Sequence, residues 1–148
     1  MTELNFALDV EDGWPPVAIE CIPYTGTGGG YRIDAAPLFV KNISVGDVIS
    51  VEEVSPENVT AWTHVSRSKR TTIWLLRMGE PHDIPNILEE LRSLDCNTLQ
   101  LAQLGCYSVD VPAECPIAKV DACLARLDKS RVAIAYPSFR HLEQGIEP

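Results

Sequence analysis

A glycine-rich run from Gly26 to Gly30 is the first segment of the chain whose composition could do chemistry. Glycine loops bind phosphate when their backbone N–H groups open onto a helix N-terminus, and phosphate loops add a lysine there. Here Tyr31-Arg32-Ile33 follows, which is typical of a strand, and no lysine is adjacent. We therefore interpret the run as a hairpin turn or loop and not as a phosphate site.

The cysteines are the second candidates, because a thiolate beside a base can act as a nucleophile. Cys115 precedes Pro116 at the expected start of a helix, where the helix dipole lowers the pKa of a thiol. An enzyme built on Cys115, or on an Asp–His pair, is therefore kept as an alternative. The remaining cysteines suit reduced and mostly buried positions: Cys21, Cys96, Cys106 and Cys123.

The histidines and paired carboxylates form no motif of their own. His64, His82 and His141 are not spaced from another His, Cys or acid as in a known metal motif. The pairs Glu11-Asp12 and Glu52-Glu53 are adjacent, and neighbouring side chains of a strand point to opposite faces, so neither pair makes a catalytic dyad. We predict that the chain uses no metal and no cofactor.

The charge of the chain is concentrated in its first half. The net charge is −9, from 12 basic and 21 acidic residues. Residues 1–66 hold ten acids and two bases (−8), which leaves eleven acids and ten bases (−1) for residues 67–148. A nucleic-acid backbone requires the opposite sign, and the short basic run Arg67–Arg70 is interpreted as a solvated turn. A basic protein partner would be attracted.

The composition is that of a globular protein in a reducing compartment. Hydrophobic residues make up 45% and charged residues 22% of the chain. No apolar run approaches the ~18–20 residues that cross a bilayer, and the first residues do not resemble a signal peptide. With unpaired cysteines, these features predict cytoplasmic residence and no membrane partner.

The elements that must position these residues change type near Arg67. Before it, short runs separated by turns such as Asp12–Pro16 predict a curled antiparallel sheet or a partly open barrel. The strands expected there are residues 4–10, 17–22, 31–34, 48–54 and 59–65, with another extended segment at 37–40.

After Arg67 the pattern alternates between strands and helices. Strands are expected at 71–78, 97–102, 105–111 and 132–136. One helix is expected to begin at Asp83, which can cap it, and to carry Pro85 in its first turn; a second begins at Pro116. This β-α-β-β-α-β order is ferredoxin-like. The chain is thus predicted to be α+β, with an acidic β-rich half at 1–66, a ferredoxin-like half at 67–139 and a polar tail at 140–148.

Several segments of the first half carry a family resemblance: Asp12–Pro16, Glu20, Tyr31–Ile33, Pro37–Val40 and Ile43–Ile49. On these residues the chain resembles a family of small bacterial proteins catalogued only as a domain of unknown function. The chain departs from the family pattern at Ile22-Pro23-Tyr24 and at Leu38. The resemblance implies a bacterial origin and a compact adaptor without an established activity. Proteins of this size and charge often accompany secreted toxins as immunity proteins. The immunity role is thus inferred by association and not from a motif.

These observations lead to two functional hypotheses besides the enzyme. The first is a non-enzymatic protein-binding module, most concretely an immunity protein that neutralises a basic toxin domain. Its partner-binding residues would be the acids Asp9, Glu11, Asp12, Glu20, Glu52, Glu53 and Glu57 and the aromatic anchors Trp14, Tyr24 and Trp62. The second is a regulatory domain that binds a small ligand in the crevice between the two halves, in a pocket of about 300 Å³ or more.

Overall fold

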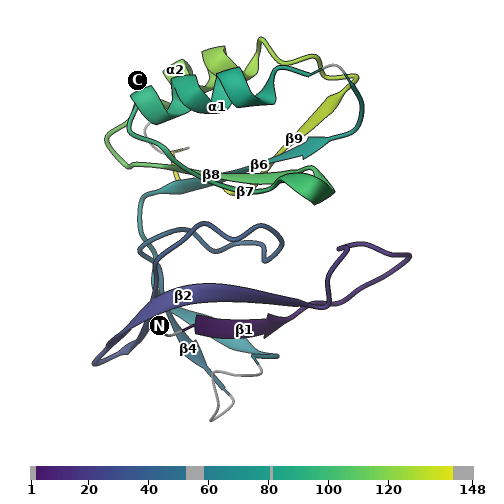
Figure 1. Cartoon of the computed structure of the whole chain (residues 1–148). Coiled ribbons are helices and arrows are strands. Elements are labelled where there is room, and N and C mark those ends of the chain that lie inside the picture. The colour runs from purple at the N-terminus through teal and green to yellow at the C-terminus, as the bar shows by residue number, and fades with distance from the viewer. Residues whose placement is uncertain (1–2, 53–58, 81, 142–148) are drawn as a thin grey trace.

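The computed structural model describes residues 3–52, 59–80 and 82–141. The described chain is an α+β protein in which two antiparallel sheets lie one above the other, with two helices on the outer face of the second sheet (Figure 1). The first sheet has the strand order β1-β2-β3-β4-β5. Its strands are β1 (Glu3–Ala7), β2 (Ile19–Thr27), β3 (Gly30–Ile33), β4 (Val48–Val51) and β5 (Trp62–Ser66).

The first sheet forms because alternate residues of its strands are apolar and point inward. Leu4 and Phe6 of β1 are buried, and the residues between and beside them are less so. A parallel bridge joins Phe6 to Val59, with the Ala7 N–H bonded to the Val59 carbonyl at 2.9 Å. The core of this half comprises Leu4, Phe6, Ile22, Ile33, Val40, Ile43, Ile49 and Val59.

The second sheet has the strand order β7-β8-β6-β9, and all its pairs are antiparallel. Its face toward the helices includes Ile73 and Leu75, whereas Thr72 and Trp74 alternate with them and face the first half. Its elements are β6 (Thr71–Arg77), α1 (Ile84–Ser93), β7 (Asn97–Leu101), a 3-10 turn (Ala102–Leu104), β8 (Cys106–Val111), α2 (Ile117–Leu124) and β9 (Val132–Ser138).

Both helices bury the apolar stripes that their spacing predicts. In α1 the buried residues are Ile84, Ile87, Leu88 and Leu91; in α2 they are Val120 and Leu124. The expected cap of α1 is wrong, because the Asp83 side chain makes no cap bond and instead accepts the Asn86 amide at 2.7 Å. The His82 Nδ1 atom accepts the Ile84 N–H at 3.3 Å.

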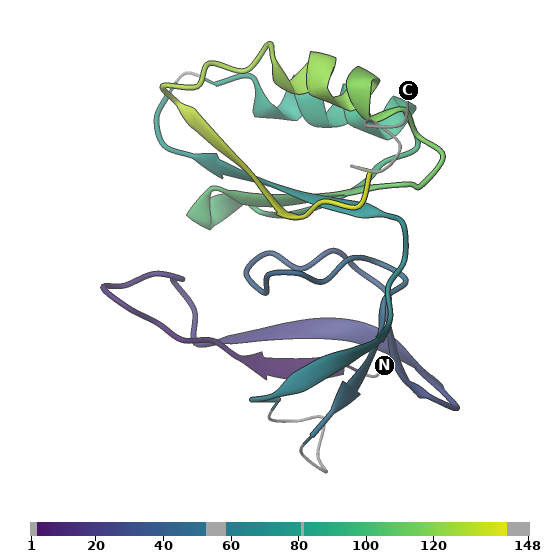
Figure 2. The same cartoon turned by 180° about the vertical axis from the view of Figure 1, so that it is seen from behind.

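A loop between β3 and β4, residues 34–47, lies between the two sheets (Figure 2). Residues of the second sheet donate hydrogen bonds to its carbonyl groups: Ser108 to Ala36 at 2.9 Å and Trp74 to Pro37 at 2.7 Å. The second sheet is therefore covered on both faces, by helices on one side and by this loop on the other. The segment 37–40, expected to be extended, belongs to the loop and forms no strand.

The carboxylate of Asp47 ties the two halves together at the end of this loop. It is fully buried, and each of its oxygens accepts an Arg140 guanidinium N–H at 2.9 Å. It also accepts the backbone N–H groups of Ser68 at 2.8 Å and Ser44 at 3.0 Å, and it lies 3.0 Å from His64 Nε2. Burial by itself raises the pKa of Asp47, but Arg140 and the two backbone donors outweigh it and lower that pKa.

The polar tail expected from residue 140 does not begin there. Arg140 is held by Asp47, and His141 is completely buried. The His141 Nε2 atom donates to the Pro112 carbonyl at 2.9 Å, which leaves Nδ1 to accept the Thr71 hydroxyl at 2.5 Å. The polar side chains of Arg140 and His141 predict a solvated segment, and only their tertiary partners show that they are held by the folded chain. Residues 142–148 lie outside the described residues.

The glycine run forms a turn of the first sheet, and the turn expected at 55–58 lies outside the described residues. Strand β2 runs through Gly26 to Thr27 and β3 starts at Gly30, so that Gly28 and Gly29 form the turn of a hairpin. The interpretation of the glycine run as a hairpin is confirmed. Within the part of the chain described here, no helix is long and apolar enough to cross a membrane.

Candidate binding groove between the two sheets

A hairpin arm, residues 8–18, extends from the ends of β1 and β2 (Figure 1). The Leu8 N–H bonds to the Ala18 carbonyl at 2.8 Å at its base. At its tip, Glu11 and Trp14 exchange backbone bonds of 2.9 and 3.0 Å around Asp12 (φ 56°) and Gly13 (φ 80°). Positive φ at both central residues is the type I′ turn that Asp-Gly favours. The turn predicted at this place is thus confirmed.

The arm returns Trp14 to the loop between the sheets. The rings of Trp14 and Phe39 meet edge to face, with centroids 6.0 Å apart, and Trp14 is 50% exposed. Edge-to-face packing of this kind stabilises by about 0.5–1.5 kcal/mol beyond the area buried. Trp14 therefore packs against Phe39 while half of the residue stays in contact with solvent.

Glu20 fixes the segment that carries Phe39. Its carboxylate accepts three successive backbone N–H groups, those of Leu38 at 2.5 Å, Phe39 at 2.9 Å and Val40 at 3.1 Å. Glu20 is only 8% exposed. Burial raises the pKa of Glu20 more than the three N–H groups lower it, so that the net direction is upward.

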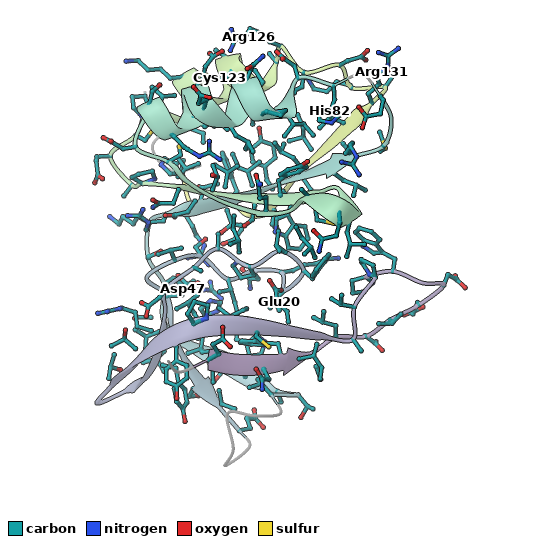
Figure 3. The ribbon with its side chains drawn as sticks, in the orientation of Figure 1. Glu20, Asp47, His82, Cys123, Arg126 and Arg131 are labelled. Carbon is teal, nitrogen blue, oxygen red and sulfur yellow. The ribbon has the colours of Figure 1, made fainter. Side chains whose placement is uncertain are left out.

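The burial of Glu20 corrects its expected place on an acidic binding surface. Figure 3 shows Glu20 and Asp47 at the level of the loop between the layers, whereas Cys123, Arg126 and Arg131 lie on the helical side. The glutamate acts through the loop and not on a partner directly. Sequence reasoning missed this because the three N–H groups that it binds lie about twenty positions along the chain.

Two adjoining hollows, which we call the aromatic groove, lie where the arm, the loop and the second sheet meet. The larger has a volume of about 620 Å³ and the smaller about 230 Å³. Trp14, Phe39 and Trp74 line both of them. The larger hollow is also lined by Trp62 and Phe6, so that all three tryptophans of the chain and two of its three phenylalanines meet there.

Exposed charges stand around the larger hollow. Asp9 and Glu11 reach it from the arm, and Lys41 reaches it from the loop. Asp12 is exposed at the tip of the arm, one residue beyond the lining. Two carboxylates and one ammonium leave this mouth of the groove with a net negative charge, in a half of the molecule that is itself acidic.

Other residues expected in the binding surface lie elsewhere. Tyr24 packs edge to face on Tyr31 with centroids 4.9 Å apart, against the core of the first sheet. Glu52 is exposed just after β4. Glu53 and Glu57 lie outside the described residues. The structure therefore brings together Asp9, Glu11, Trp14 and Trp62.

Sequence reasoning missed several groove residues, among them Phe39, Lys41 and Trp74. Trp74 was assigned to an apolar strand, and its position between the core residues Ile73 and Leu75 already placed it on the opposite face. Phe39 and Lys41 had no such signal, because a loop has no periodicity from which to infer direction.

Burial raises the pKa of the cysteine thiols at and near the groove, among them Cys106, which lines the smaller hollow. Cys115 is buried, and burial raises the pKa of its thiol in place of the lowering that a helix start would give. Burial also raises the pKa of Cys96 to about 12. Among residues 3–52, 59–80 and 82–141, no group of three or more His, Cys, Asp or Glu side chains is placed to hold a metal ion. The groove places aromatic side chains beside the exposed carboxylates of Asp9 and Glu11.

Comparisons with known proteins define the family and the fold. Residues 25–134 match the family described as "Domain of unknown function (DUF4265)", and the chain belongs to this family. The resemblance inferred from the sequence is thereby confirmed. No curated protein matches the chain. A solved structure, "Novel crystal structure of a hypothetical protein from Neisseria gonorrhoeae", is similar with a TM-score of 0.71 at 15% identity, over 94% of this chain and 96% of that one. The two proteins share a fold.

Proposed function

We propose that this chain is a non-enzymatic protein-binding module that holds an apolar side chain of a basic partner in the aromatic groove. Its most concrete form is an immunity protein that neutralises a cognate bacterial toxin domain in the cytoplasm. The observation that carries the proposal is the convergence of all three tryptophans on one hollow whose mouth carries Asp9 and Glu11. Tryptophans in pockets dominate binding energy at interfaces, and rim carboxylates steer a basic partner.

Binding of a toxin domain encoded beside this chain tests the proposal. The tryptophans in the groove make its intrinsic fluorescence a direct report of occupancy. Trp14→Ala should weaken binding by about 2 kcal/mol or more, a roughly 30-fold rise in Kd. The matched control is Phe139→Ala, an exposed aromatic 37% accessible on the other half of the molecule, which should leave Kd within about twofold. Equal effects of the two substitutions would remove the groove from the interface.

A genetic test addresses the immunity role separately. Deleting the gene for this chain should kill the cell only while the neighbouring toxin gene is intact. A cell indifferent to that deletion contradicts the immunity role, and the fluorescence titration then still decides whether the groove binds a protein.

A small-ligand-binding regulatory domain is the second candidate. Its supporting observation is the volume of the larger hollow, about 620 Å³, which falls within the roughly 300–1,000 Å³ of ligand pockets. Asp9, Lys41 and Thr60 provide polar groups in its lining. A screen of metabolites by thermal shift should then find a compound that stabilises the wild type and fails to stabilise Trp62→Ala. A compound that stabilises both equally binds elsewhere.

We also propose finer descriptions of the two halves. The bridge between Phe6 and Val59 supports a first sheet curled into a partly open barrel. The strand order β7-β8-β6-β9, with α1 and α2 as the crossover connections, supports a ferredoxin-like second half.

A further inference from the structure

The smaller hollow has the chemistry of a pocket for one bulky apolar side chain. Its lining includes Cys106, Ala133 and Ala135, which leave space beneath the aromatic rings. The Cys106 thiol is buried and its pKa is raised, so it carries no charge at neutral pH. The Trp74 indole N–H is already donated to the Pro37 carbonyl. A polar occupant would find few free partners here and would lose its hydration, whereas an apolar one gains by burial.

The larger hollow has the chemistry of a site for a cation. The exposed carboxylates of Asp9 and Glu11 line it, and the single ammonium of Lys41 offsets one of them. The indole rings of Trp14 and Trp62 line the same space. Faces of indole rings attract Arg and Lys head groups, and carboxylates add direct pairing. An anion would meet repulsion from both kinds of group.

The two hollows are close enough to be filled by one short segment. They share the wall made by Trp14, Phe39 and Trp74, and the first two of these rings have centroids only 6.0 Å apart. An extended chain advances about 3.3 Å per residue and points every second side chain to the same face, so that side chains two positions apart, roughly 6.6 Å, can reach two hollows that adjoin at this wall.

We infer that the groove recognises an extended segment of the partner protein in which a bulky apolar residue lies two positions from an arginine or lysine. The apolar side chain occupies the smaller hollow and the cationic one the larger. This inference rests on the proposed function and names the chemistry of the partner that it binds.

A displayed library of random dodecapeptides, selected on the immobilised full chain, tests the inference without knowledge of the natural partner. Selected peptides should be enriched in Trp, Phe, Leu or Ile two positions from Arg or Lys. The most enriched peptide is then made with a fluorescein label, and its Kd is measured by anisotropy at 50 and 500 mM salt.

Two sets of variants separate the hollows. The double substitution Asp9→Asn, Glu11→Gln should weaken the peptide about tenfold and remove most of the salt dependence of Kd. Ala133→Leu fills the smaller hollow and should weaken the peptide at least as much while keeping the salt dependence; Ala135→Leu is the second filling variant if the first fails to fold. The control pair, Glu89→Gln with Glu114→Gln, removes the same charge from exposed sites of the second half and should leave Kd unchanged.

The outcomes distinguish the inference from the proposed function. Two outcomes overturn the inference and leave protein binding by the groove standing. In the first, the selected peptides need Trp14 but lack a basic residue. In the second, they bind the Asp9→Asn, Glu11→Gln variant as well as the wild type. Peptides that bind Trp14→Ala undiminished, or a selection without any consensus, overturn the inference as well, and the toxin-domain titration then decides the proposed function independently.

Discussion

Arg140→Met tests whether the pair between Arg140 and Asp47 holds the two halves together. The substitution keeps an apolar stem of similar length and removes the guanidinium. It deletes both bonds to the Asp47 carboxylate, each 2.9 Å, one to the Ser68 carbonyl, also 2.9 Å, and one to the Asn42 carbonyl at 3.3 Å. Because Asp47 is fully buried and the Arg140 side chain is only 12% exposed, solvent screens the pair little. Breaking a buried pair on one side costs about 3–5 kcal/mol.

Urea and thermal unfolding, followed by circular dichroism and tryptophan fluorescence, measure this loss. At roughly 2–4 °C per kcal/mol for a chain of this size, Tm should fall by roughly 6–20 °C. The control is Arg32→Met, whose pair with Asp34 is 3.5 Å long and half exposed and should contribute only about 0–1 kcal/mol. If the Arg140 variant loses no more stability than this control, the reasoning is refuted.

The pH dependence adds a second readout of the same pair. The native pKa of Asp47 is lowered, so its contribution is present above the unfolded value of about 3.9 and is lost as pH falls through the native pKa. In Arg140→Met the largest lowering influence on that pKa disappears and burial remains. The stability difference between the wild type and Arg140→Met should therefore be largest above about pH 4 and should shrink as pH falls through the native pKa of Asp47.

Three further substitutions probe other parts of the structure. The pKa of Glu20 is raised in the folded chain. The wild type should therefore lose stability relative to Glu20→Gln as pH rises above about 4.3. Urea midpoints of the two proteins that keep a constant difference from pH 4 to 8 contradict this. Gly30→Ala places a methyl group against the Ile49 carbonyl and should cost about 1–3 kcal/mol in urea unfolding, whereas Gly28→Ala, which meets open space, should stay within about 0.5 kcal/mol. Gly13→Ala strains a residue at φ 80° in the arm, and the free energy of unfolding should fall by only about 1–2 kcal/mol. Partner binding should weaken because the neighbouring Trp14 is displaced. Unchanged binding would show that the arm does not contribute to the groove.

Local pattern predicted the order of the elements because secondary structure follows periodicity. The buried stripe Ile84, Ile87, Leu88 and Leu91 repeats at helical spacing, and the alternation around Ile73 and Leu75 repeats at strand spacing. The ends of the strands were predicted less accurately. Strand β1 ends at Ala7 and not at Val10, because the turn at Asp12-Gly13 makes the residues after Ala7 part of the arm.

The groove was predicted only as a collection of residues. The excess of acids and the aromatic residues Trp14 and Trp62 were visible in the sequence as types that bind partners. Their place on a common hollow depends on segments far apart in the chain, since Phe39 and Trp74 complete the wall from a loop and from the second sheet.

The sequence by itself determined the class of structure and the acidic character of the first half. It also showed that the chain carries no phosphate-loop or metal motif. The tertiary structure alone decided which acids are available to a partner. Glu20 and Asp47 look like Asp9 and Glu11 in the sequence, yet the first two are buried and bind groups of the protein itself. The physical reason is that a carboxylate enters the interior only where donors from distant segments meet it, and no local pattern records that meeting.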